Sequence, residues 1–362
     1  MENETSLRRL LLAPASFAYG VITRSRLALY RTGVLPTYRV NAPVISVGNI
    51  TTGGTGKTPL VEWIARAVAN QRRQVCILTR GYGRIHASRR VIVSNGKSIL
   101  AGAREAGDEA RLLAEALAGQ AAVISDADRV SAARWARENL GSEVFILDDG
   151  FQQLRLARNL NIATIDATNP WGGRSLLPAG HLREPLTGLE RADCIVITRA
   201  DQAGEIDSLR RELDRLTRGT PIFSSRMTPR GLRPLGAYDP PKTGDVRPSL
   251  NTMGSTDAGS PVTVFCAIGN PQSFFTTVRN SGYAVCHTRA FGDHHWYKQR
   301  DVDMLGRESI GRGAQTLLTT AKDAVKLTSL RFDLPCYVLE IEIEIENEHD
   351  LLAMIRAATS SE

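Results

Sequence analysis

Short apolar runs alternate with longer stretches of helical spacing along the first two thirds of the chain. Runs rich in β-branched residues predict strands at Val44–Val47, Val75–Thr79, Ala121–Ser125, Val144–Leu147, Ala163–Ile165 and Cys194–Thr198. Between them, apolar residues at helical spacing predict helices at Pro59–Ala69, Glu109–Leu117, Arg129–Glu138 and Ser208–Leu216. This alternation is typical of an α/β fold with a doubly wound, mostly parallel sheet.

The pattern changes between Pro229 and Pro261, where prolines are frequent and apolar periodicity is lost, so we predict an extended linker or ribbon. Beyond it, the pattern predicts a helix at Ser273–Asn280 and strands at Val262–Ile268, Thr316–Thr319 and Cys336–Ile345. We therefore expect four parts: an N-terminal helix (1–35), a main α/β domain (36–228), the linker (229–261) and a smaller α/β domain (262–362).

Carboxylates alternate with isoleucines in the last predicted strand, at Glu340, Glu342 and Glu344. Strict alternation is typical of a strand with one face in water. We interpret these glutamates as a solvated face and not as a metal site.

The N-terminal segment has the apolar spacing of one helix face from Leu7 to Val21, with arginines beside it and after it. Its apolar stretch, Leu10–Thr23, is shorter than the roughly 20 residues that span a bilayer. Two alternatives stay open: an interfacial helix whose arginines contact anionic head groups, and a first helix packed on the core.

Composition narrows the class of protein. With 362 residues, 42% of them hydrophobic, the chain is neither disordered nor fibrous. The net charge of +7 is uneven: residues 1–90 hold 14 Lys/Arg and 3 Asp/Glu (+11), and the remaining 31 and 35 give −4. A basic N-terminal quarter attracts phosphate in nucleic acid, anionic lipid or a small substrate, and charge alone does not choose among them.

The five cysteines are widely spaced among apolar neighbours and include no C-x-x-C pair. A disulfide framework or a zinc site needs clustered cysteines, so we predict buried thiols in a reducing, cytoplasmic compartment.

A glycine-rich loop lies between the first predicted strand of the sheet and its helix, and consists of Thr51, Thr52, Gly53, Gly54, Thr55, Gly56, Lys57 and Thr58. In such a loop, backbone N–H groups and a helix N-terminus bind phosphate. Lys57 would contact the β- and γ-phosphates of a nucleotide, and the hydroxyl of Thr58 would bind Mg²⁺. The full pattern G-x-x-x-x-G-K-[ST] is not met, because Thr51 stands where glycine is expected.

Two carboxylates, Asp148 and Asp149, follow the predicted strand Val144–Leu147. Ligands of open α/β sheets bind at the carboxyl ends of the strands. We predict that Asp148 holds Mg²⁺ or its water, and that Asp149 contributes to the same site.

Eight ordered motifs between about residues 44 and 327 resemble those of the tetraacyldisaccharide 4′-kinase family. They are Ser46–Asn49 with the loop and Pro59, Arg80–Arg84, Gly107–Glu109, Asp148–Gln152, Leu177–Glu184, Gly269–Pro271, Phe291–His295 and Thr320–Lys326. Family members commonly carry Glu where Ala321 stands, and residues 235–260 align with nothing.

The resemblance implies ATP- and Mg²⁺-dependent phosphorylation of the 4′-hydroxyl of a tetraacylated glucosamine disaccharide 1-phosphate in lipid A biosynthesis. It also implies a P-loop NTPase-type sheet and a peripheral position at the cytoplasmic face of the inner membrane. The expected partners are the lipid substrate and an anionic membrane surface, with no nucleic acid and no obligate protein partner.

Roles for single residues also come from the resemblance. Asp108 matches the family's proposed catalytic base, and His294 matches the histidine that pairs with it; Lys57 and Arg183 would neutralise transition-state charge. Glu184 lies in the region of the metal. The residues assigned to the lipid head group are Arg80, Tyr82, Arg84 and Gln152.

Without the resemblance, Asp108 is an acidic residue at a helix start, where N-capping is the ordinary role. Two other classes of function therefore stay open: a P-loop switch or ATPase without a sugar acceptor, and a nucleic-acid-binding protein. An acceptor base favours the kinase over the switch, and the lack of a recognised nucleic-acid motif disfavours the last class.

Overall fold

The computed structural model describes residues 2–236 and 260–360, with side chains from Leu11 onward. The chain divides into two compact units. Unit 1 comprises Met1–Leu78, Asp128–Arg226 and Ile345–Glu362, and unit 2 comprises Thr79–Ala127 and Met227–Glu344. This division differs from the expected boundaries, because Thr79–Ala127 groups with the C-terminal part of the chain and Ile345–Glu362 with the P-loop part.

The sheet of unit 1 has the strand order β8-β7-β6-β1-β5-β2, and all its strand pairs are parallel. The strands are β1 (Val44–Gly48), β2 (Val75–Thr79), β5 (Val144–Asp148), β6 (Leu160–Asp166), β7 (Cys194–Thr198) and β8 (Ile222–Pro234). The strands β1, β2, β5, β6 and β7 are buried along their whole length, as strands covered on both faces must be.

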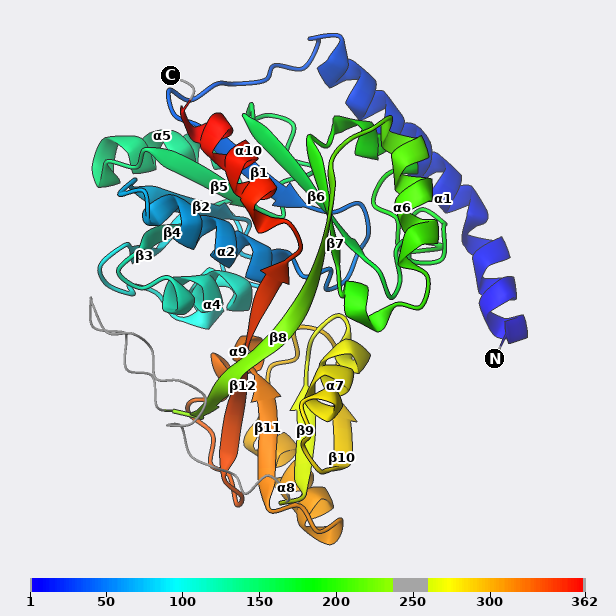
Figure 1. Ribbon diagram of the computed structural model, residues 1–362, viewed down its shortest axis with the longest axis vertical. Helices are drawn as coiled ribbons and strands as arrows, with labels where there is room; N and C mark the ends of the chain where they lie inside the picture. The colour runs from blue at the N-terminus through cyan, green and yellow to red at the C-terminus, as the bar shows by residue number, and fades with distance from the viewer. Residues whose placement is uncertain (1, 237–259, 361–362) are drawn as a thin grey trace. The chain divides into compact units, whose positions relative to one another are not determined.

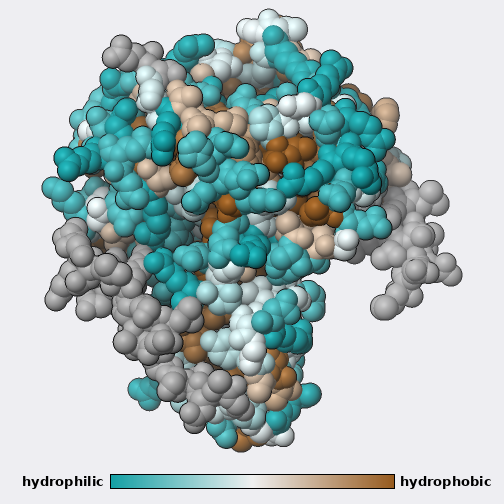
Figure 2. Space-filling model, in the orientation of Figure 1, coloured by the Kyte–Doolittle hydropathy of each residue, from teal (hydrophilic) through white to brown (hydrophobic). Residues whose placement is uncertain are grey.

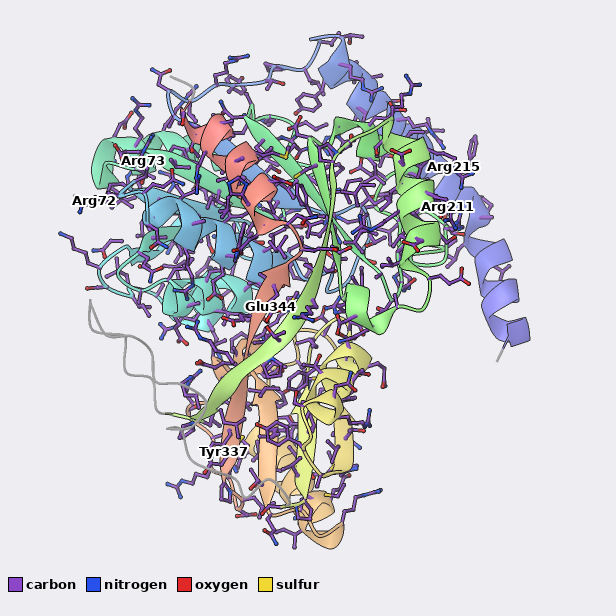
Figure 3. The ribbon with its side chains drawn as sticks, in the orientation of Figure 1. Arg72, Arg73, Arg211, Arg215, Tyr337 and Glu344 are labelled. Carbon is purple, nitrogen blue, oxygen red and sulfur yellow. The ribbon has the colours of Figure 1, made fainter. Side chains whose placement is uncertain are left out.

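The helices of unit 1 are α1 (Glu2–Arg31), α2 (Lys57–Ala69), α5 (Arg129–Leu140), α6 (Ile206–Thr217) and α10 (Glu348–Ser360), with short 3₁₀ turns η1 (Leu186–Arg191) and η2 (Ala200–Gln202). Helices α2 and α10 lie side by side on one face of the sheet (Figure 1). Figure 2 shows mostly hydrophilic residues over α5 and α6, and Arg211 and Arg215 extend outward from α6 in Figure 3.

Helix α1 continues through Pro14 and lies on unit 1 along one narrow stripe. Gly20 is buried and Ser16, Tyr19 and Thr23 are half-buried in that stripe. Most of its large apolar side chains are instead exposed, while Leu12 and Leu27 are half-buried; the exposed ones are Leu11, Phe17, Val21, Ile22 and Leu29. The structure therefore does not support the core-packed alternative. In the parts of the chain that the structure describes, no helix is long and apolar enough to cross a membrane.

Unit 2 contains a parallel run of strands in the order β10-β9-β11-β12, with β8 beside β12, and an antiparallel pair, β3 and β4. Its strands are β3 (Val91–Asn95), β4 (Ala121–Ser125), β9 (Val262–Cys266), β10 (Val285–Ala290), β11 (Thr316–Thr320) and β12 (Cys336–Ile345). Its helices are α3 (Ala103–Ala106), α4 (Asp108–Ala116), α7 (Pro271–Asn280), α8 (Gln299–Gly311) and α9 (Ala321–Ala324).

Several expectations need correction. The predicted linker begins inside a strand, because β8 continues to Pro234; its residues 237–259 lie outside the described ranges. The sequence pattern does not predict strands β3, β8 and β10 or helices α3, α8, α9 and α10. All five cysteines are free thiols, but Cys286 and Cys336 are only partly buried.

The alternation in β12 is confirmed from Glu342 to Ile345 but not before it, because Ile341 is exposed and Glu340 is half-buried. Ile343 and Ile345 are buried, and Glu342 and Glu344 are exposed. Glu340 lies 3.1 Å from Arg233 of β8. Within residues 2–236 and 260–360, no cluster of three or more His, Cys, Asp or Glu side chains could hold a metal ion.

Candidate active site

The glycine-rich loop connects β1 to α2 as the sequence predicts. Gly53 (φ 107°) and Gly56 (φ 75°) take left-handed backbone conformations that a side chain would strain. Gly56 precedes α2, which begins at Lys57. The loop thus ends in the unpaired N–H groups and partial positive charge of a helix N-terminus, the arrangement that binds phosphate.

Thr164 of β6 and Thr198 of β7 hold the loop in place through Thr55. The hydroxyls of Thr55 and Thr164 are 2.9 Å apart, and Thr198 Oγ1 donates to the carbonyl of Thr55 at 3.0 Å. These three side chains are buried. The loop conformation is therefore set by β6 and β7 as well as by its own glycines.

The segment Leu177–Glu184 pairs with the glycine-rich loop through the backbone. The amide of Thr52 donates to the carbonyl of His181 at 2.7 Å, and the amide of Arg183 donates to the carbonyl of Ile50 at 2.7 Å. The resemblance implies that Arg183 neutralises transition-state charge, and these hydrogen bonds bring its segment to the glycine-rich loop.

Asp149 lies between two cations. Arg183 Nη1 is 2.7 Å from Asp149 Oδ1 and 3.0 Å from Oδ2, and Lys57 Nζ is 3.6 Å from Oδ1. Burial would raise the pKa of Asp149, but the charges of Lys57 and Arg183 lower it to about 2. Asp149 also has a left-handed backbone (φ 53°), a strained conformation of the kind found at functional sites.

Asn49 accepts hydrogen bonds from the same two cations. No role in the site is predicted for this residue from the sequence. Its buried side chain accepts from Lys57 Nζ at 3.2 Å and from Arg183 Nη1 at 3.4 Å. Its amide donates to the carbonyl of Thr51 at 2.8 Å. The Ser46–Asn49 motif was the only sequence signal for it.

Two of the predicted metal ligands, Asp148 and Thr58, belong to β5 and α2. Asp148 is buried at the carboxyl end of β5, and its strand register with Val47 puts it beside the start of the loop. Thr58 is the second residue of α2. Carboxylate and hydroxyl oxygens at this edge are a donor set that suits Mg²⁺.

Glu184 and Gln152 instead bind one another. Gln152 Nε2 donates to Glu184 Oε1 at 2.7 Å, and Arg191 Nη1 donates to Glu184 Oε2 at 2.7 Å. Glu184 is only 3% exposed. Since both its oxygens already accept strong hydrogen bonds, these contacts favour a supporting role over direct metal ligation.

In unit 2, Asp108 and His294 form a direct pair although they are far apart in the sequence. His294 Nδ1 lies 2.9 Å from Asp108 Oδ2 and 3.0 Å from Oδ1. Gly107, with φ 93°, is the N-cap of α4, so Asp108 is the first helical residue and not the capping residue. His294 itself has a left-handed backbone, with φ 59°.

The pKa values of the pair move apart. Burial would raise the pKa of Asp108, but the hydrogen bond from His294 and the nearby lysines lower it to about 2. The hydrogen bond with Asp108 raises the pKa of His294 above its ordinary value. An ionised carboxylate can only accept, so Nδ1 of His294 carries a proton and donates.

The segment Arg80–Arg84 gives a mixed result. Tyr82 is 68% exposed, and its ring centroid is 5.3 Å from that of His294. Arg80 is also exposed. Arg84 differs from the expectation, because it is buried and its guanidinium donates to the carbonyls of Ser125 and Ala87. It therefore supports the segment from within, and is not presented to a ligand.

Comparison with known proteins gives one family. The LpxK family model, described as tetraacyldisaccharide-1-P 4′-kinase, matches residues 8–360. A tetraacyldisaccharide 4′-kinase of Geobacter metallireducens is 39% identical over 317 residues, or 88% of each chain. Another, of Desulfotalea psychrophila, is 35% identical over 351 residues, or 96% of this chain and 97% of that one.

A solved structure is similar over nearly the whole chain. LpxK from Aquifex aeolicus, described as an apo form in complex with ATP, matches with a TM-score of 0.74 at 30% identity. The match covers 97% of this chain and 99% of that chain.

Proposed function

Because the chain belongs to the tetraacyldisaccharide-1-phosphate 4′-kinase family of lipid A biosynthesis, we propose that Lys57 and its loop hold ATP and that Asp108 with His294 accepts the proton of the 4′-hydroxyl. The pair carries this proposal, because a hydroxyl that accepts a phosphoryl group must lose its proton to a base, whereas a nucleotide switch that phosphorylates no hydroxyl needs none. Asp108 and His294 are within hydrogen-bond distance of each other.

The loop is suited to a nucleotide of the P-loop NTPase type. Its glycines and the N-terminus of α2 would bind the β- and γ-phosphates, and Lys57 would contact their oxygens. Arg183 would neutralise charge on the transferred phosphoryl group once it leaves Asp149. Asp149 and Asn49 contact both Lys57 and Arg183.

Thr58 and Asp148 are the residues that would hold Mg²⁺, with Asp149 close by. When bound, Mg²⁺ would supply positive charge that neutralises the charge developing on the transferred phosphoryl group. Glu184 would keep Gln152 and Arg191 in place beside this site through its hydrogen bonds.

In unit 2, Asp108 would take the acceptor proton, and His294 would hold Asp108 in orientation through the hydrogen bond that its Nδ1–H donates. Phosphoryl transfer gains most of its rate from positioning and charge neutralisation, so a modest base held in a fixed orientation is sufficient. Tyr82 and Arg80, exposed on the same segment, would contact the anionic head group of the lipid.

Helix α1 would lie at an anionic membrane surface on the cytoplasmic side. Its exposed Phe17, Val21 and Ile22 would enter the acyl boundary, and its arginines would contact head groups. Tyr19 connects this helix to the site, because its hydroxyl donates to the carbonyl of Arg183 at 2.9 Å.

The test is a comparison of ATP turnover with and without acceptor. The purified protein is incubated with Mg²⁺ and γ-labelled ATP, alone or with the tetraacylated disaccharide 1-phosphate. We expect label to be released only in proportion to lipid phosphorylated at the 4′ position. Release at the same rate without lipid would instead support the switch or ATPase.

A further inference from the structure

The motif Thr320–Lys326 has no role in the proposed function, yet its two lysines contact the acidic residues that begin α4. Lys322 Nζ is 3.0 Å from Glu109 Oε1, and Lys326 Nζ is 3.5 Å from Asp108 Oδ2. Both lysines belong to unit 2, as do Asp108 and Glu109.

Lys326 is placed as a buried cation between two carboxylates. Its side chain is 0% exposed, and its Nζ also lies 3.3 Å from Asp323 Oδ1. Asp323 is fixed in turn, because it accepts from Thr320 Oγ1 at 2.7 Å, from the amide of Ala267 at 3.1 Å and from the hydroxyl of Tyr297 at 3.1 Å. A fully buried ammonium group costs much free energy unless carboxylates surround it, so this position is specific.

Lys322 bridges the two segments that carry the pair. Besides Glu109, which follows Asp108, it contacts Asp293, which precedes His294, at 3.4 Å. Its side chain is 14% exposed. Lys322 thus contacts the residue next to Asp108 and the residue next to His294. Lys326 contacts Asp108 itself.

We infer that Lys322 and Lys326 are positioning residues that hold Asp108 against His294 and keep the pair ready to accept a proton near neutral pH. This inference rests on the proposed role of the pair. Neither lysine needs to touch substrate.

The charge effect has a definite sign. A cation near a proton-accepting group favours its deprotonated form, so removal of either lysine should raise the apparent pKa of the pair. The groups that face the pair from the elements around it are Tyr82, Glu109, Asp293, Tyr297, Lys322, Asp323 and Lys326. The lysines are the cations of that set, and the carboxylates oppose them.

The experiment measures kcat/KM for the lipid acceptor against pH in the full-length protein. We expect Lys322→Met to raise the apparent pKa on the acidic side of this pH profile (the acid limb) by about one unit, because a positive charge close to the pair is lost. Lys326→Met should shift this apparent pKa in the same direction. Lys322→Arg keeps the charge and should restore the parent limb. Lys97→Met removes an exposed lysine of the same unit and should leave the limb unmoved.

A second measurement avoids dependence on activity. The imidazole of His294, identified by loss of its NMR signal in His294→Gln, is titrated in the folded parent and in Lys322→Met. An upward shift of its pKa supports the inference, and an unchanged pKa in folded Lys322→Met and Lys326→Met overturns it. If Asp108→Asn turns over at the parent rate, the proposed function fails and the inference fails with it. If Asp108→Asn is inactive while both lysine variants keep the parent limb, only the inference fails.

Discussion

The Nδ1 atom of His294 lies 2.9 Å from Oδ2 of Asp108, although 186 positions of sequence separate the two residues. The hydrogen bond raises the pKa of His294 and, with the nearby lysines, lowers that of Asp108 to about 2. The imidazole of His294 therefore binds its proton more tightly in the folded protein than in the unfolded chain.

Protein stability should depend on pH through this pair. Since the pKa of His294 is raised, its contribution is fully present below the unfolded value of about 6.5 and is lost as pH rises through the folded value. We expect the free energy of unfolding to fall on His294→Gln, most at about pH 5 and least at about pH 9. Urea denaturation measures this. When Asp108 is already replaced by Asn, the effect of His294→Gln on the free energy of unfolding should no longer depend on pH. If His294→Gln instead reduced the free energy of unfolding more at high pH than at low pH, the proposed hydrogen bond to Asp108 would be contradicted.

A second prediction concerns the nucleotide loop. Asn49→Ala removes the acceptor that Lys57 and Arg183 share, and the two cations lose their common position. A hydrogen bond to a charged group contributes about 1.5–3 kcal/mol, so KM for ATP should rise roughly tenfold or more. Steady-state kinetics test this. Asn139→Ala, an exposed asparagine on α5, is the control, and equal KM values for the two variants would show that Asn49 does not position the cations.

A third prediction concerns the end of β1. An added methyl group at Gly48 would collide with the backbone nitrogen of Phe151, which cannot rotate away. Gly48→Ala should therefore reduce the free energy of unfolding by about 2 kcal/mol or more. Gly204→Ala meets no atom within 4 Å and should change it by less than about 0.5 kcal/mol. Similar denaturation midpoints for both variants would contradict the packing described here.

A fourth prediction concerns membrane association. Phe17 (72% exposed) and Ile22 (65% exposed) face away from unit 1, so replacing both by Glu should leave the thermal midpoint nearly unchanged. Co-sedimentation with vesicles containing anionic lipid should fall strongly, because apolar area and favourable charge are both lost. Val34→Glu alters an apolar residue of similar exposure outside the helix and should sediment like the parent. Undiminished binding of the double variant would argue against the interfacial role of α1.

Many of the strands and helices could be predicted from the sequence, because the strands of unit 1 are short and apolar and are separated by helices of clear periodicity. Strands β2, β4, β7 and β12 begin and end where the pattern predicts. The antiparallel β3 is absent from the prediction because its sequence, VIVSN, ends in two polar residues and it is only partly buried, unlike the fully buried runs of β2 and β7. The strand β8 is absent from the prediction because Pro229 and Pro234 fall within it, and proline is tolerated in strands only at special positions.

The site was predictable where one motif contains the chemistry, as in the loop around Lys57. Long-range contacts could not be read from local pattern. In the sequence, Arg84 cannot be distinguished from Arg80, which is exposed. Only the fold shows that the guanidinium of Arg84 donates hydrogen bonds to the carbonyls of Ser125 and Ala87. Lys322 and Lys326 are likewise ordinary residues of a short motif until α4 is placed against α9.

The roles given to Asp108 and Lys57 are tested most directly by a rapid-quench single turnover with γ-labelled ATP, Mg²⁺ and the disaccharide lipid. The parent should transfer label to the 4′ position. Asp108→Asn should bind ATP like the parent but transfer label at least about 100-fold more slowly, a typical effect of losing a general base. Transfer by Asp108→Asn at the parent rate, while Lys57→Ala is inactive, would contradict the assignment of the proton acceptor.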